Sequence, residues 1–352
     1  MLQLYEKGVI KDLEDDVNDY LPFEVRNPNY PTTPITIRML LSHRSGLVHD
    51  LPYQFFWDTE GTFYPKYRLT YKSGILDLSV EEFLNASLTP SGANYRSNIW
   101  LFEPGTEYSY SGSAFVLLKY LIEQVTNQSV ANYMQENIFG PLGMKNTGFN
   151  ASNFAGHHAI PYTRIGGTNH DLPVWSGQLM IRSSVSDMAQ FLIAHINQGQ
   201  NGDFQLLQPG TIDLMHAKIS SWSAYRDPQW NGPYDYNLNA EGYGLGWEQF
   251  IDDIEGHGGS VPGYMALMYC KQTEKGPFGV IILINANGIL GSEDDFAAVY
   301  KIVKTVRNVL LYELGLIGPK TRLVLILRIA GVLILIAVTG VFVYKRRQRK
   351  NS

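Results

Sequence analysis

The sequence has very little cysteine: Cys270 is the only one among its 352 residues. A single cysteine excludes an internal disulfide and any zinc cluster built from cysteine thiolates, and it does not indicate in which redox compartment the protein works. Cys270 ends an apolar stretch, residues 264–270. We therefore predict a buried side chain that packs as a small apolar group.

An excess of basic residues is also absent, because 28 lysines and arginines stand against 33 aspartates and glutamates, for a formal net charge of −5. The dense basic run is KRRQRK, at residues 345–350. Nucleic acid is therefore not expected as a partner. Charged residues make up 17% of the chain and hydrophobic ones 45%, which favours one large or two smaller globular domains over a disordered or fibrous chain.

A long apolar run lies near the C-terminal end. Residues 323–344 carry one charge, Arg328, and exceed the roughly 20 residues that a helix needs to cross a bilayer. Arg328 lies near the start of the run, where its long side chain can reach the headgroups. We predict a transmembrane helix over 323–344. Five basic residues follow it, so the positive-inside rule predicts a cytoplasmic tail at 345–352 and a single-pass protein of the cell membrane whose main domain, residues 1–318, is extracytoplasmic.

The start of the sequence disagrees with this topology. An exported domain is expected to begin with a signal peptide, but residues 1–8 are typical of the end of an amphipathic helix closed by Gly8. Either the domain is cytosolic and tail-anchored, or the sequence lacks its beginning.

Helical patterns dominate the first two thirds of the main domain, and strand-like patterns follow. Thr36, Ser79 and either Ser184 or Ser186 are suited to cap predicted helices, and Gly46 is suited to end the first of them. Further helices are predicted from residue 113 onward, over 130–138 and over 294–314, and strands over 243–250, 264–269 and 279–285. This order favours a sheet packed against helices, with a helical subdomain.

Five short motifs occur one after another in the main domain: LLSHRSGL at 40–47, PGTEYSYSG at 104–112, PLGM at 141–144, GYGLGW at 242–247 and GHGGSVPG at 256–263. Together they resemble the family of class C β-lactamases, D-alanyl-D-alanine carboxypeptidases and related serine esterases, over residues 1 to about 315. The resemblance implies an α+β fold of the β-lactamase/transpeptidase type. Such a fold has an antiparallel sheet flanked by helices plus a helical subdomain, here followed by the transmembrane helix.

The resemblance also implies a site. In that family a Ser-x-x-Lys helix supplies the nucleophile and its base, a Tyr-x-Asn loop lies opposite, and a Lys-Thr-Gly or His-x-Gly strand forms a third wall. Tyr110 matches the tyrosine, which works as phenolate or proton relay, and His257 matches the first residue of the third wall, where it donates to a substrate oxygen. Substrate-binding roles are implied for Ser111, Gly258, Gly259 and Ser260, the last through a backbone N–H that matches an oxyanion-hole donor.

Other interpretations of these residues stay open. In the alternative interpretation, Tyr110 is a buried tyrosine that only packs, and His257 is a histidine of a surface turn. His43 and Ser45 are interpreted as parts of a helix exit rather than as a catalytic pair. Three histidines, His157, His158 and His170, lack the spacing and the nearby carboxylate that zinc sites favour, and no metal or organic cofactor is implied.

Two departures from the family pattern affect the expected chemistry. Gly112 stands where the asparagine is usual and has no side chain to bind a substrate amide, which favours ester or peptide hydrolysis over β-lactam hydrolysis. No serine in the sequence has a lysine three residues further on. The nucleophile is therefore expected upstream of Met1, and the chain as given is expected to be inactive.

The sequence thus predicts a membrane-anchored serine hydrolase of the esterase or D-Ala-peptidase type. It would act through an acyl-enzyme on a small acyl substrate: an ester, a D-Ala peptide or a β-lactam. The alternative hypothesis is a non-catalytic, surface-displayed binding protein on the same fold.

Overall fold

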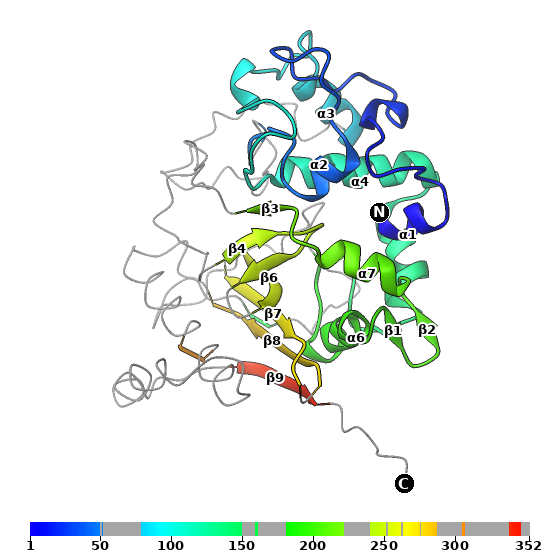
Figure 1. Cartoon of the computed structure of the whole chain (residues 1–352), viewed down its shortest axis with the longest axis vertical. Helices are drawn as coiled ribbons and strands as arrows, with labels where there is room; N and C mark the ends of the chain where they lie inside the picture. Colours follow the sequence, from blue (N-terminus) through cyan, green and yellow to red (C-terminus); the bar gives the residue numbers. More distant parts are fainter. Residues whose placement is uncertain are drawn as a thin grey trace. The chain divides into compact units, whose positions relative to one another are not determined.

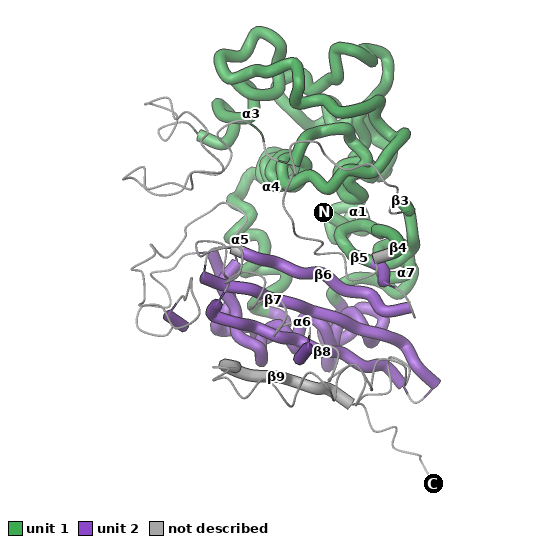
Figure 2. The backbone as a smooth tube through the Cα atoms, turned by 90° about the vertical axis from the view of Figure 1, so that its left-hand side faces the viewer, with its two compact units in different colours: residues 1–140, 176–180, 206–248 green, residues 141–175, 181–205, 249–352 purple. Residues whose placement is uncertain are grey.

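A computed structural model of the chain describes residues 1–49, 51, 79–149, 159–160, 181–221, 240–250, 253–261, 263–274, 276–286, 305–306 and 338–345. The chain divides into two compact units (Figure 2). Unit 1 comprises residues 1–140, 176–180 and 206–248, and unit 2 comprises residues 141–175, 181–205 and 249–352.

Unit 1 is mainly helical and is organised around one long helix, α4 (Gly112–Thr126). α4 contacts α2 (Ile37–Leu41), α3 (Val80–Leu88) and α5 (Val130–Met134). The buried face of α4 includes Leu117 and Leu121, which have no exposed surface. The unit also contains α1 (Leu2–Glu6), η1 (Val17–Asp19), η4 (Ser97–Ile99), the π-helical turn η5 (Gln135–Phe139), α7 (Pro209–His216) and the antiparallel pair β3 (Ser220–Ser221) and β4 (Ala240–Tyr243) (Figure 1).

The helix starts confirm the predicted caps. Thr36 ahead of α2 and Ser184 ahead of α6 (Val185–Ile196) each accept a hydrogen bond from the backbone N–H three residues further on. Ser79 forms a complete capping box with Glu82 at the start of α3. A hydroxyl in this position satisfies one of the backbone donors that the first turn of a helix leaves unpaired.

The end of α2 differs from the prediction, which makes Gly46 the terminator. α2 ends at Leu41, and His43 is the first residue beyond it with a positive φ, at 56°. Gly46 also has a positive φ, and its missing side chain leaves room for the carbonyl oxygen of Phe102, which lies 2.5 Å from where a Cβ would stand. The exit therefore contains two left-handed residues, and the first is a histidine, a residue type enriched in this conformation.

Unit 2 is built on an antiparallel run of strands, which confirms the predicted sheet. β6 (Ile254–Val261), β7 (Tyr264–Lys271), β8 (Phe278–Ile284) and β9 (Val338–Lys345) are paired in that order, and α6 packs against β7, β8 and β9 (Figure 1). Gly279 on β8 permits this close packing, since a Cβ there would stand 2.6 Å from Cδ2 of Leu192 on α6. A small hairpin, β1 (Gln200–Asn201) and β2 (Phe204–Gln205), follows α6, and β5 (Glu248–Phe250) lies where the sequence passes from unit 1 to unit 2.

The C-terminal part of the chain differs from the predicted helix at 323–344. Residues 338–345 form β9, in which Val341 pairs with Ile282 and Val343 with Val280. Over 338–344 the structure has a strand, so the helix predicted for 323–344 is not shown there. Residues 323–337 lie outside the described part of the chain. Among the residues that the structure describes, no helix is both long enough and apolar enough to cross a bilayer.

Cys270 lies on β7 with 5% of its surface exposed, which confirms the predicted burial. Burial raises the pKa of its thiol and keeps the group protonated. A protonated buried thiol is unreactive, so Cys270 contributes packing rather than chemistry.

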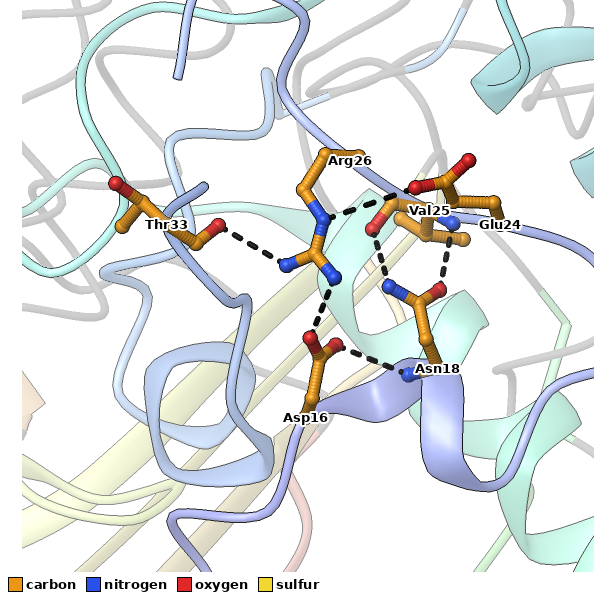
Figure 3. Close-up of polar contacts among 6 residues, drawn as sticks. All are labelled: Asp16, Asn18, Glu24, Val25, Arg26 and Thr33. Atoms are coloured by element: carbon orange, nitrogen blue, oxygen red, sulfur yellow. Dashed lines mark hydrogen bonds and ion pairs between the residues drawn. The ribbon is translucent and has the colours of Figure 1, made fainter. Parts of the chain in front are cut away.

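Polar contacts fix the loop between η1 and α2 (Figure 3). The Arg26 guanidinium donates to the Asp16 carboxylate and to the carbonyl oxygen of Thr33. The Asn18 side chain pairs with the Val25 backbone in both directions, as donor to the carbonyl oxygen at 3.2 Å and as acceptor from the N–H at 2.7 Å. Side chains thus form hydrogen bonds with backbone N–H and C=O groups of the loop, which have no partner in a helix or a β-sheet.

In the same region, a hydrogen bond between Tyr20 and Asp15 is expected to make a pH-dependent contribution to the stability of the fold. The Tyr20 hydroxyl donates to the Asp15 carboxylate and, as the main cause, lowers the pKa of that carboxyl from its ordinary value of 3.8. A lowered folded-state pKa adds stability above the ordinary pKa, and this stability is lost as pH falls through the lowered value. We expect Tyr20→Phe to lower the free energy of unfolding at neutral pH by about 0.5 kcal/mol, since Asp15 is open to solvent.

Chemical denaturation at neutral pH and at about pH 3 measures this effect, and the difference between Tyr20→Phe and the unchanged protein should shrink at the lower pH. Tyr30→Phe, at an exposed tyrosine of the same unit, is the control. An equal loss of stability at both pH values would show that the hydroxyl stabilises the fold without the Asp15 charge.

Candidate functional site

Tyr110 directly precedes the residue that caps helix α4. Ser111 is that cap: its Oγ accepts from the N–H of Ala114 at 3.1 Å and donates to the carbonyl oxygen of Val48 at 2.9 Å. Ser111 has no exposed surface. Its hydroxyl therefore holds the start of α4 in place.

Tyr110 is the exposed tyrosine of an aromatic cluster in unit 1. Its ring centroid lies 4.3 Å from that of His43, 5.3 Å from that of His49 and 6.4 Å from that of Tyr243. Tyr110 is 36% exposed, whereas Tyr108 and Tyr243 are 4% and 1% exposed. Burial raises the pKa of Tyr108 and of Tyr243 well above the usual range, so both phenols stay protonated. Tyr110 is therefore the tyrosine of this cluster that a molecule in solvent can reach.

His43 lies against Tyr110, a position that sequence analysis missed. The interpretation of His43 as part of a helix exit is correct, but the exit brings its ring into the aromatic cluster, 4.6 Å from Tyr243 and 5.0 Å from Phe115 between centroids. Its Nδ1 accepts from the N–H of Ser111 at 3.0 Å across 68 residues of sequence. No spacing rule relates positions so far apart, and the left-handed φ of His43 gave no signal in the sequence.

His257 lies on strand β6, opposite Met268 of β7. The resemblance implies that His257 lies on a strand, and the structure shows this: most of the motif at 256–263 belongs to β6. Because side chains alternate along a strand, His257 and Gly259 share one face, and Gly258 and Ser260 share the other. His257 is half-buried and its Nδ1 lies 2.6 Å from the carbonyl oxygen of Gly258.

The glycines of β6 serve different purposes. A Cβ at Gly256 would stand 2.1 Å from the carbonyl oxygen of Met268, so the sheet itself requires glycine there. A Cβ at Gly258 would stand 3.2 Å from the end of the Leu267 side chain and 3.7 Å from the carbonyl oxygen of Ala266. A Cβ at Gly259 would meet nothing within 4 Å, and the residue is exposed. The face that carries His257 is therefore open at Gly259.

The structure describes the two predicted walls separately, since Tyr110 belongs to unit 1 and His257 to unit 2. Within the described residues, no group of three or more histidine, cysteine, aspartate or glutamate side chains is arranged to hold a metal ion. His157, His158 and His170 lie outside those residues.

A family model described as Beta-lactamase matches residues 1–303. The described units have the α+β architecture of β-lactamase/transpeptidase-like proteins, and solved structures of such proteins resemble the chain. The chain belongs to the Beta-lactamase family.

Curated relatives are similar over most of the chain. Penicillin-binding protein 4* of Bacillus subtilis is 26% identical over 291 residues, which cover 76% of this chain and 54% of that protein. Protein flp of Staphylococcus aureus is 24% identical over 298 residues, which cover 82% of this chain and 50% of that protein. The chain thus spans about half the length of these relatives.

Solved structures resemble the chain in fold. The octameric penicillin-binding protein homologue from Pyrococcus abyssi has a TM-score of 0.57 at 22% identity, over 86% of this chain and 62% of that one. The beta-lactamase/D-alanine carboxypeptidase from Yersinia pestis has a TM-score of 0.55 at 21% identity, over 86% and 78%. The D-amino acid amidase from Ochrobactrum anthropi has a TM-score of 0.51 at 21% identity, over 81% and 72%.

The β6 glycines give a matched pair of stability tests. Gly256→Ala should lower the free energy of unfolding by about 2 to 3 kcal/mol, because the new methyl group meets backbone that cannot move aside. Gly259→Ala should change it by less than about 0.5 kcal/mol, because its methyl group enters open space. Urea unfolding of both variants measures the difference, and similar effects of the two substitutions would contradict the register of β6 on β7.

Proposed function

We propose that this protein is a serine hydrolase that takes the acyl group from a small ester, D-aminoacyl peptide or amide and passes it to water. In the first step a serine oxygen bonds to the carbonyl carbon, its proton leaves through Tyr110, and the alcohol or amine departs with a proton. In the second step water attacks the acyl-enzyme and the serine regains its proton. The observation that carries the proposal is the placement of Tyr110, partly exposed and fixed at the start of α4.

The aromatic cluster supports a role for Tyr110 in proton transfer. Tyr108 and Tyr243 are buried with raised pKa values, and the Tyr243 ring lies against the rings of both Tyr108 and Tyr110. Such neighbours lower the local dielectric and hold the ring in one orientation, which is what general acid–base catalysis requires. Packing alone would not explain why the central tyrosine of the sequence motif remains exposed.

The strand β6 supports a substrate-facing role for His257 and Gly259. The open space at Gly259 lets a substrate approach the strand, and the imidazole of His257 lies two residues away on the same face. Ser260 is proposed to contribute its backbone N–H to the oxyanion hole. Gly112 offers no side chain to a substrate amide, so we propose that an ester is preferred to a β-lactam.

This proposal assigns the nucleophile to no serine of the given sequence. The acyl-enzyme route needs a serine with a nearby base, and none of the serines in these 352 residues has a lysine three positions on. The second candidate function is a non-catalytic binding protein on the same fold. The two are separated by covalent labelling of the native gene product, at the length at which the cell makes it.

We expect that product to be labelled by a fluorophosphonate or a fluorescent penicillin, and Tyr110→Phe to slow labelling by about 100-fold or more without unfolding the protein. Gly259→Ala should slow labelling too, because its methyl group enters the space proposed for the substrate, whereas Gly210→Ala is the matched control, with an equally open Cβ on helix α7. If the folded protein is not labelled, the hydrolase proposal is wrong and the binding protein is the remaining candidate.

We propose separately that residues 323–344 anchor the protein in the cell membrane, with residues 1–318 outside the cytoplasm. Support comes from the apolar run and the basic block after it. A membrane helix and strand β9 exclude each other over 338–344, because a spanning helix satisfies all its backbone groups within itself. The full chain should stay with membranes after alkaline carbonate washing, and a chain ended at residue 322 should be released and remain folded. Release of the full chain, or unfolding of the shortened one, would favour β9 instead.

A further inference from the structure

The backbone N–H groups of Ser109 and Ser111, the residues on either side of Tyr110, both bind His43. Before Tyr110, the N–H of Ser109 donates to the carbonyl oxygen of His43 at 2.9 Å. After Tyr110, the N–H of Ser111 donates to Nδ1 of His43 at 3.0 Å. Between these two bonds the rings of His43 and Tyr110 lie 4.3 Å apart. His43 thus holds residues 109–111 at three points, through the N–H groups of Ser109 and Ser111 and through the Tyr110 ring.

The three contacts depend on the conformation of His43. Its φ of 56° turns the chain at the end of α2, so that its carbonyl oxygen and its side chain both face residues 109–111. The side chain is 1% exposed and enclosed by rings that include Phe115 and Tyr243. A buried ring in one rotamer, bound at Nδ1, has little freedom to move, so the loop that it binds has little freedom either.

A second histidine binds the next residue in the same way. Nδ1 of His49 accepts from the N–H of Gly112 at 3.3 Å, and the carbonyl oxygen of His49 accepts from the N–H of Ser113 at 3.0 Å. The first turn of a helix leaves several backbone donors without partners, and here the segment 43–49 supplies acceptors for three consecutive ones, from Ser111 to Ser113. His49 binds residues farther along α4, and its Nδ1 contact is longer, so its effect on Tyr110 is expected to be smaller.

We propose that His43 is the positioning residue for Tyr110 and that it works as a neutral imidazole protonated on Nε2. Only a ring nitrogen without a proton can accept the Ser111 N–H, which fixes the tautomer. The inference rests on the proposed function, because fixing the position of Tyr110 affects a reaction rate only if Tyr110 takes part in catalysis. A reacting group displaced by about 1 Å loses on the order of 100-fold in rate. His43 touches no substrate in this scheme and acts through Tyr110 alone.

Two substitutions at His43 separate hydrogen bonding from backbone conformation. Asparagine and glycine both tolerate the left-handed φ, but only the Oδ1 atom of asparagine can replace Nδ1 as acceptor. We expect His43→Asn to keep the acylation rate within about 5-fold of the unchanged protein and His43→Gly to lose roughly 100-fold, with little change in the probe concentration at half-maximal rate. His49→Ala, which removes the weaker contact, should lose less than His43→Gly.

Equal rates for His43→Asn and His43→Gly would overturn the proposal, because the backbone turn alone would then suffice. A loss confined to the probe concentration at half-maximal rate would overturn it as well, since that result marks a binding residue. Hydrogen exchange at the Ser111 amide gives a readout that needs no activity: it should be roughly 3- to 10-fold faster in His43→Gly than in His43→Asn.

One measurement on the unchanged protein covers the case in which a variant fails to fold. In a uniformly 15N-labelled sample, a scalar coupling between the Ser111 amide nitrogen and Nδ1 of His43 reports the N–H···N hydrogen bond directly. Its presence supports the proposal, and its absence for a resolved amide overturns it. Failure of all covalent labelling together with a present coupling would reject the hydrolase and keep the structural link between His43 and Tyr110.

Discussion

The hydrogen bonds between His43 and the peptide groups on either side of Tyr110 are the constraint on which the site in unit 1 depends. They join the end of α2 to the start of α4, the helix around which the unit is organised. Because the Ser111 hydroxyl caps α4 and also binds Val48, the helix cannot shift without breaking contacts to the segment that follows His43. These hydrogen bonds fix the backbone on both sides of Tyr110, which is itself partly exposed.

A different constraint shapes the wall in unit 2, where backbone geometry rather than side-chain hydrogen bonding decides which positions are open. Gly256 is required by the neighbouring strand, whose carbonyl oxygen occupies the place of a Cβ, whereas Gly259 has free space above it. The same residue type therefore maintains the sheet at one position and exposes it at the other. His257 lies between them, on the open face.

Much of the fold could be predicted from the sequence because its signals are local. The caps at Thr36, Ser79 and Ser184 depend on residues within one turn, and the structure confirms each of them. The GHGGSVPG motif was harder, since glycines weaken a strand pattern and only pairing with β7 makes β6 a strand. The apolar residues 338–344 satisfy the pattern of a membrane helix and that of an edge strand alike, and here they pair with β8.

The sequence by itself determined the family, the helix starts and the positions of Tyr110 and His257 in their motifs, because each follows from residue types at short spacing. Only the tertiary structure decided that Ser111 is a buried cap, that Gly259 is open, and that His43 binds the loop around Tyr110. The reason is physical: a hydrogen bond across 68 residues, or the space above a glycine, exists only after distant segments have packed together.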